Sequence, residues 1–247
     1  MSEDRRVPRR SDNEIRDEAC RAKKAYGAAG RHPVNVIRCL QSGWIPTRQG
    51  KKNLVYNVVD DHEMEGKDGR TEFTPDAVII AVKRSVHEKA NWGDGRSRMT
   101  LAHELAHGVM HDGAAAFRGS NAVGATEISR ANASESAEHQ AKVFASAFLI
   151  DDDVARTLAS AEEISTEFLT SLEAARICFE RLAEEAERAR SVERVRKSNE
   201  AFQASMRKPG QQFKYTGDFC GICGNATLLP VGIKFLCTTC GNVSDMS

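Results

Sequence analysis

The sequence has few aromatic residues and no excess charge of either sign. Only 6% of its 247 residues are aromatic, and its 35 Lys and Arg residues balance its 35 Asp and Glu residues. A chain without net charge has no whole-molecule attraction to nucleic acid or to an anionic membrane, so any such contact must be local. With 40% hydrophobic and 28% charged residues, the composition excludes a fibrous protein and is typical of a soluble globular protein of one or two domains.

Long apolar runs are also missing. No stretch approaches the roughly 18 consecutive apolar residues that cross a bilayer, so we expect no membrane partner. The first residues, Met-Ser-Glu-Asp-Arg-Arg, lack the apolar segment of a secretory signal, which predicts a cytoplasmic protein. The seven cysteines are an odd number, and four of them form two close pairs near the C-terminus. This distribution favours a metal site over a disulfide framework.

Composition and periodicity together predict an α+β protein in four parts. Basic residues without apolar periodicity indicate a flexible tail over 1–12. A globular domain follows over 13–160, then a long helical connector over 161–207, then a small unit over 208–247. Within the globular domain we expect helices over 14–28, 33–43, 100–111 and 134–150, strands over 54–59 and 77–82, and loops over 60–69 and 112–131.

The connector has apolar or small residues at alternating steps of three and four between residues 170 and 206. Such spacing is typical of a coiled coil, although it slips between Ala189 and Val192. Two interpretations stay open: a long helix packed on its own domain, and self-association of the protein through residues 170–206.

A five-residue pattern on the third predicted helix points to chemistry. His103, Glu104 and His107 form His-Glu-x-x-His, and residues four apart lie on the same face of a helix, so both imidazoles can reach one zinc ion. Glu104 then lies beside the metal without binding it. There its carboxylate can take a proton from the zinc-bound water and pass it to a leaving amine, which is hydrolase chemistry.

A third zinc ligand is available on the next helix. Glu138 precedes an apolar face formed by Ala141, Phe144, Ala145 and Phe148, and packing of this face on the first helix would point Glu138 inwards. Two histidines, one carboxylate and one water complete a catalytic tetrahedral site. His111 lies a turn beyond His107 and is rotated away, so we interpret it as a packing or substrate-pocket residue. His139 is expected to point away from the ligands.

Three segments carry a resemblance to a known family: Pro33-Val-Asn-Val-Ile37, Arg98-Met-Thr-Leu-Ala-His-Glu-Leu-Ala-His107 and Glu138-x-x-Ala141-x-x-Phe144-Ala145-x-x-Phe148-Leu149-Ile150. Through these segments, residues 30–155 resemble the ImmA/IrrE family of zinc metallopeptidases. It implies zinc bound by His103, His107 and Glu138, with Glu104 as general base, in a zincin-like α+β fold with a small sheet against the active-site helix. It also implies a substrate class: bacterial transcriptional repressors, cut to release stress-response or mobile-element genes.

The C-terminal cysteines indicate a second, structural zinc. Cys220-Gly-Ile-Cys223-Gly and Cys237-Thr-Thr-Cys240-Gly are separated by thirteen residues, a pattern typical of a zinc ribbon with a hairpin over 227–231 and 233–236. About forty residues cannot build a sufficient core, so zinc held by four thiolates would supply the folding energy. The weak positive charge of this unit favours protein recognition or stapling of the terminus over DNA binding.

These observations predict a cytoplasmic zinc metalloendopeptidase with one catalytic and one structural zinc. Its substrate would be a regulatory protein, such as a DNA-binding transcriptional repressor. One alternative is a non-catalytic zinc-ribbon regulator that binds DNA or a repressor. A second alternative is an SprT-like protease, which also joins His-Glu-x-x-His to a zinc ribbon but takes its third ligand from a downstream histidine. Only His111 and His139 follow His107 here, which disfavours that alternative.

Overall fold

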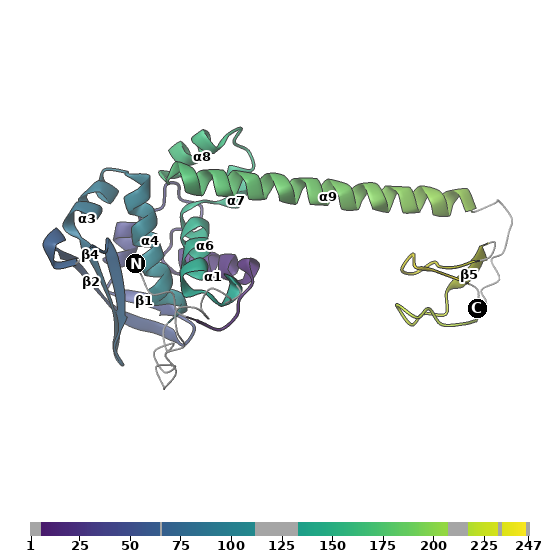
Figure 1. Cartoon of the computed structure of the whole chain (residues 1–247), viewed down its shortest axis with the longest axis horizontal. Helices are drawn as coiled ribbons and strands as arrows, with labels where there is room; N and C mark the ends of the chain where they lie inside the picture. The colour runs from purple at the N-terminus through teal and green to yellow at the C-terminus, as the bar shows by residue number, and fades with distance from the viewer. Residues whose placement is uncertain (1–5, 65, 112–132, 207–216, 232–233, 246–247) are drawn as a thin grey trace. The chain divides into compact units, whose positions relative to one another are not determined.

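The computed structural model describes residues 6–64, 66–111, 133–206, 217–231 and 234–245, with side chains described outside residues 201–206 (Figure 1). The chain divides into two compact units, Met1–Ala183 and Glu184–Ser247. Helix α9 (Leu172–Met206) begins in the first unit and continues in the second. No helix in the described ranges is long and apolar enough to cross a membrane. The mixture of helices and small sheets confirms the predicted α+β class.

A four-stranded sheet lies in the first unit, with strand order β1-β2-β4-β3. β2 runs parallel to β4, and the other neighbours are antiparallel. The two predicted strands are confirmed as β2 and β4, whereas the predicted loop over 60–69 holds a short 3-10 helix, η1, and the start of β3. The bounds are β1 (Trp44–Thr47), β2 (Gly50–Val59), η1 (Asp61–Met64), β3 (Gly69–Phe73) and β4 (Ala77–Lys83).

Helices pack on the sheet in layers. α4 contacts both the sheet and α6, and α1 packs against α6 (Figure 1). A Cβ atom at Gly108 would lie 2.5 Å from Cδ1 of Ile45, so glycine lets α4 approach the sheet closely. The core between these layers includes the fully buried Leu101, Leu105, Phe144 and Phe148. The helices are α1 (Asp12–Ala25), α2 (Val36–Leu40), α3 (Arg84–Asn91), α4 (Gly95–Met110) and α6 (Ala137–Leu149), with the 3-10 turn η3 (Ala133–Glu135) before α6.

The predicted start of the helix that carries His103 differs from the structure. α4 begins at Gly95, so Thr100, where the predicted helix starts, lies inside the helix and donates its hydroxyl to the Arg96 carbonyl. A Cβ atom at Gly95 would lie 2.2 Å from the backbone of Thr170. A larger residue at this position would clash with the Thr170 backbone, which explains why the helix begins with a glycine. The loop predicted over 112–131 lies outside the described residues.

Residues 6–11 are part of the fold, so the predicted flexible tail over 1–12 is wrong for this segment. The Val7 N–H donates to the Glu135 carbonyl at 2.8 Å, and the Arg10 N–H donates to the Ser134 carbonyl at 3.0 Å. Both side chains are buried, and Ser11 then caps α1 together with Glu14. A short irregular segment has no apolar periodicity, which is why the sequence pattern misses its burial.

The end of the first unit holds a second group of buried side chains. α7 (Asp152–Ala155) has Asp151 as its N-cap, whose side chain accepts from the Asp153 N–H. α8 (Ala161–Phe168) and the first turns of α9 pack together through Ile164, Phe168, Ala175, Cys178 and Leu182. This burial places them in the first unit, so residues 161–183 are not a free connector.

The second unit holds the rest of α9 and a small antiparallel sheet of β5 (Leu228–Val231), β6 (Lys234–Cys237) and β7 (Val243–Asp245). β5 and β6 confirm the predicted hairpin, and β7 adds a strand. In this part of α9, Val192 and Val195 are 69% and 61% exposed. Self-association through this helix stays a prediction.

Candidate metal centres

α4 and α6 bring the three predicted catalytic ligands together. His103 and His107 lie on one face of α4, with their Nε2 atoms 3.0 Å apart. Glu138 lies in the first turn of α6, with one carboxylate oxygen 3.2 Å from His103 Nε2 and the other 3.5 Å from His107 Nε2. We call this set the His/Glu site. All three side chains are half-buried, so the site is accessible.

These distances suit a tetrahedral metal ion. Zinc takes nitrogen and oxygen ligands at about 2.0–2.1 Å, which places tetrahedral ligand atoms about 3.3 Å apart. The three separations of 3.0, 3.2 and 3.5 Å are close to this value. Three protein ligands leave the fourth position for water or substrate, as catalytic zinc sites do.

The electrostatics of Glu138 also favour a cation. The neighbouring imidazoles of His103 and His107 lower the pKa of the Glu138 carboxyl well below its ordinary value, so it is ionised. Ser136 caps the same helix end by accepting from the His139 N–H at 3.0 Å. A carboxylate in the first turn is stabilised by the helix dipole.

The Glu104 side chain lies against strand β3. Thr71 on this strand donates its hydroxyl to Oε2 of Glu104 at 2.7 Å, and Glu104 is 7% exposed. A Cβ atom at Gly69 would lie 2.7 Å from Glu104 Cγ, so a side chain here would displace the carboxylate. Thr71 and Gly69 are missed by the sequence pattern because β3 itself is not predicted.

His111 is buried behind His107. Their Nδ1 atoms are 2.9 Å apart, and His111 Nε2 lies 3.3 Å from Oε1 of Gln140. Burial and the neighbouring His107 lower the pKa of His111 to about 3, which keeps it neutral. His111 is therefore packed against a ligand and does not share the site. His139 Nε2 instead lies 3.0 Å from Asp12 Oδ1, away from the ligands, as predicted.

Gln140 is a site residue that the sequence analysis missed. It lies on α6 and is fully buried. The signal that could have revealed it is a polar residue on the otherwise apolar face formed by Ala137, Ala141 and Phe144. A buried polar side chain must find hydrogen-bond partners, so such a position indicates a specific network.

The four C-terminal cysteines also converge, in what we call the four-cysteine site. Their sulfur atoms lie within 4.8 Å of one another, with Cys220 and Cys240 3.6 Å apart and Cys223 and Cys237 3.5 Å apart. Zinc–sulfur bonds of about 2.3 Å predict tetrahedral sulfur separations of about 3.8 Å. Hydrogen bonds from the Thr227 hydroxyl and from the Cys240 backbone lower the pKa of Cys237, which favours the metal-binding thiolate.

Comparisons with known proteins agree with this geometry. The family model of the IrrE N-terminal-like domain matches residues 59–203, more than half of the chain. Comparison with curated proteins and with solved structures gave no match. The matched range contains the His/Glu site, starts later than the resemblance over 30–155 and extends along α9. The chain therefore belongs to the IrrE N-terminal-like domain family, a family of metallopeptidases.

Proposed function

We propose that the protein is a zinc-dependent endopeptidase that cleaves a regulatory protein, such as a transcriptional repressor. The observation that carries this proposal is the convergence of His103, His107 and Glu138 on one point. The next residue along α4, Glu104, is available as a base because its carboxylate is not one of the three converging ligands. Membership of a metallopeptidase family supports the same chemistry.

Each side chain then has a distinct part in hydrolysis. A zinc ion bound at the His/Glu site would polarise the scissile carbonyl and lower the pKa of a water molecule. Glu104 takes a proton from the attacking water and passes it to the leaving nitrogen as the C–N bond breaks. Thr71 holds Oε2 of this carboxylate, which leaves Oε1 for the water.

The sheet suggests how a polypeptide substrate binds. β3 is at the edge of the described sheet and pairs only with β4. An extended peptide can add to such an edge through main-chain hydrogen bonds. Because Thr71 and Gly69 of β3 contact Glu104, a peptide on this edge would pass the base. This arrangement favours cleavage within a chain over removal of terminal residues.

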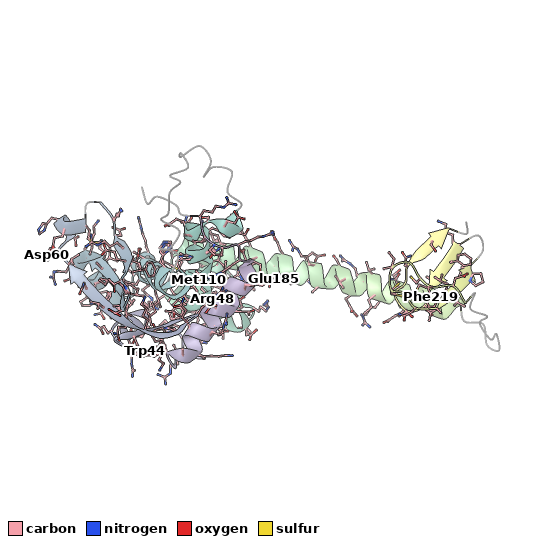
Figure 2. All side chains as sticks on the ribbon, turned by 90° about the horizontal axis from the view of Figure 1, so that it is seen from below. Trp44, Arg48, Asp60, Met110, Glu185 and Phe219 are labelled. Atoms are coloured by element: carbon pink, nitrogen blue, oxygen red, sulfur yellow. The ribbon has the colours of Figure 1, made fainter. Side chains whose placement is uncertain are left out.

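The four-cysteine unit would recognise protein. Phe219 and Ile222 beside its first cysteine pair are 74% and 73% exposed. Phe219 is labelled in Figure 2. Exposed large apolar side chains favour contact with a protein over contact with phosphates. This unit would then help to select the regulatory protein that the first unit cleaves.

The decisive substitution is Glu104→Gln, which removes the base and keeps the size of the side chain. Cells that express the wild-type protein or this variant are compared by mass spectrometry for newly formed peptide N-termini. We expect these to disappear in Glu104→Gln and to persist in Glu88→Gln, which changes an exposed glutamate on α3. Cleavage that survives Glu104→Gln contradicts the mechanism.

Zinc stoichiometry tests the sites separately. We expect two ions per chain, falling to one in His103→Ala and to one in Cys220→Ser. A single ion that survives His103→Ala would favour the non-catalytic regulator. That alternative predicts a salt-sensitive shift of a DNA probe that Glu104→Gln does not change.

A further inference from the structure

We propose that the N-terminal segment 6–10 acts through Gln140 and His111 to fix the tautomer of His107, so that the Nε2 lone pair of His107 faces the metal. Gln140 and His111 are then positioning residues of the His/Glu site. The inference rests on the proposed function in one respect: it needs a metal at this site.

The argument begins at Gln140, whose amide orientation is fixed by its neighbours. Its Nε2 lies 2.9 Å from the Pro8 carbonyl oxygen and 2.8 Å from the Ser134 carbonyl oxygen. Carbonyl oxygens only accept hydrogen bonds, so the two N–H groups of the amide must face them. A flipped amide would place its oxygen against two other oxygens in a fully buried position. Oε1 must therefore face His111.

The orientation of Gln140 decides where His111 carries its proton. Oε1 is an acceptor, so His111 Nε2, 3.3 Å away, must be the donor. His111 is 5% exposed, and its two ring nitrogens face Gln140 and His107 instead of a carboxylate, so its imidazole is neutral. A neutral imidazole has one N–H group, so His111 Nδ1 is left with a lone pair. This lone pair lies 2.9 Å from His107 Nδ1, which must then donate.

The tautomer of His107 follows from the same logic. With its proton on Nδ1, His107 has a lone pair on Nε2, the atom that lies 3.0 Å from His103 Nε2. A histidine binds metal only through an unprotonated nitrogen, and the partner of its other nitrogen fixes which one is free. In the described residues no hydrogen bond reaches Nδ1 of His103. The hydrogen-bond network therefore fixes the tautomer of His107 and not that of His103.

The N-terminal segment supplies a necessary part of this network. The Pro8 carbonyl is one of the two acceptors for Gln140, and backbone hydrogen bonds from Val7 and Arg10 to the turn before α6 hold it in place. Arg10 is 7% exposed and donates to the carbonyl of Met110, the last residue of α4. Met110 is labelled in Figure 2. The segment thus joins the end of the helix with His107 to the start of the helix with Glu138.

The tautomer can be measured in the wild-type protein. The sample has zinc in the four-cysteine site, and a chelator keeps the His/Glu site empty. We expect nitrogen-15 NMR of this sample to show His107 protonated at Nδ1 and His111 protonated at Nε2. In Gln140→Leu, His107 should become a mixture of both tautomers. A wild-type His107 protonated at Nε2 would overturn the proposal without any variant.

Zinc affinity provides the second readout. In the full chain, with the four-cysteine site already filled, competition with a chelator should show zinc binding about 10–100-fold weaker in Gln140→Leu and in His111→Phe. A chain lacking residues 1–9 should also bind more weakly. The double variant should lose no more than either single variant, because the two residues act in series. His139→Phe changes the histidine beside Gln140 that lies outside the network, and should bind as the wild type does.

The failure of this inference is distinguishable from failure of the proposed function. Equal zinc affinity in folded Gln140→Leu and wild type, or independent losses that add in the double variant, would overturn the positioning network alone. Absence of zinc at the His/Glu site of the wild type would overturn both.

Discussion

The two candidate metal sites are built in opposite ways. The His/Glu site takes its ligands from α4 and α6, whose buried faces belong to a large core with the sheet. The four-cysteine site takes its ligands from turns in a unit where Cys220 and Cys237 are themselves most of a small buried cluster with Leu228. In the first unit the fold positions the ligands, whereas in the second the ligands must hold the fold together.

The two ligand sets match these different tasks. Three ligands at the His/Glu site leave one tetrahedral position open, as chemistry at a metal requires. Four sulfur atoms at the other site close the coordination shell, as a structural metal requires. A metal would therefore be a reagent in the first unit and a structural element in the second.

The largest expected effect is the collapse of the second unit when Cys220→Ser opens its metal site. Binding of structural zinc contributes about 10–16 kcal/mol in small domains, far more than this unit can gain from its core. Hydrogen exchange should show loss of protection over β5 and β6, with α4 and α6 unchanged. Cys20→Ser, at an exposed cysteine of α1, is the matched control. Full protection of β5 and β6 without metal would show that the second unit folds without its metal ligands, contrary to the difference described between the two units.

A substitution in the core of the first unit should have the opposite effect, because it should destabilise that unit and not the second. Phe144 is fully buried, with its ring 5.8 Å from that of Phe148. Phe144→Ala should lower the free energy of unfolding of the first unit by about 3–5 kcal/mol and leave the second unit unchanged, as followed by denaturant titration. Phe219→Ala, which truncates a 74% exposed ring, should cost almost nothing. A loss shared equally by both units would mean that they unfold together.

A smaller effect is expected from a substitution that disturbs the proposed base, Glu104, and leaves the metal ligands unchanged. Thr71→Val removes the hydroxyl that holds Glu104 Oε2 at 2.7 Å. We expect kcat/KM to fall roughly tenfold, which corresponds to about 1.4 kcal/mol of transition-state stabilisation, while zinc affinity is unchanged. Thr166→Val on α8, where the side chain is exposed, serves as control. If zinc affinity fell together with the rate, Thr71 would support the whole site and not the base alone.

Local periodicity explains what the sequence predicts well. The spacing of His103 and His107 places both on one face of a helix whatever the rest of the chain does. The apolar face of α6 made the approach of Glu138 predictable, because a helix buries such a face against a neighbour. The spacing of the four cysteines likewise predicts their convergence.

Contacts between distant segments explain what the sequence does not predict. β1 and β3 are short strands of mixed polarity, and their pairing with β2 and β4 defines them. The contact of Thr71 with Glu104 depends on that pairing. The network to His107 depends on a contact between Pro8 and Gln140, 132 positions apart, and on one between Gln140 and His111, 29 positions apart, so no local pattern could reveal how it is connected.

The smallest expected effect tests how firmly the N-terminal segment is anchored. Ser11 follows this segment and forms a capping box with Glu14, in which its hydroxyl accepts from the Glu14 N–H at 3.3 Å. Ser11→Ala should cost about 1 kcal/mol, measured as a lower unfolding free energy of the first unit, with the second unit unaffected. Ser160→Ala removes the equivalent cap of α8, which lies outside the network, and should cost about the same. If the anchor of the segment matters for the metal, only Ser11→Ala will also weaken zinc binding; equal zinc affinity in both variants would show that the hydrogen bonds of residues 6–10 hold the segment without the cap.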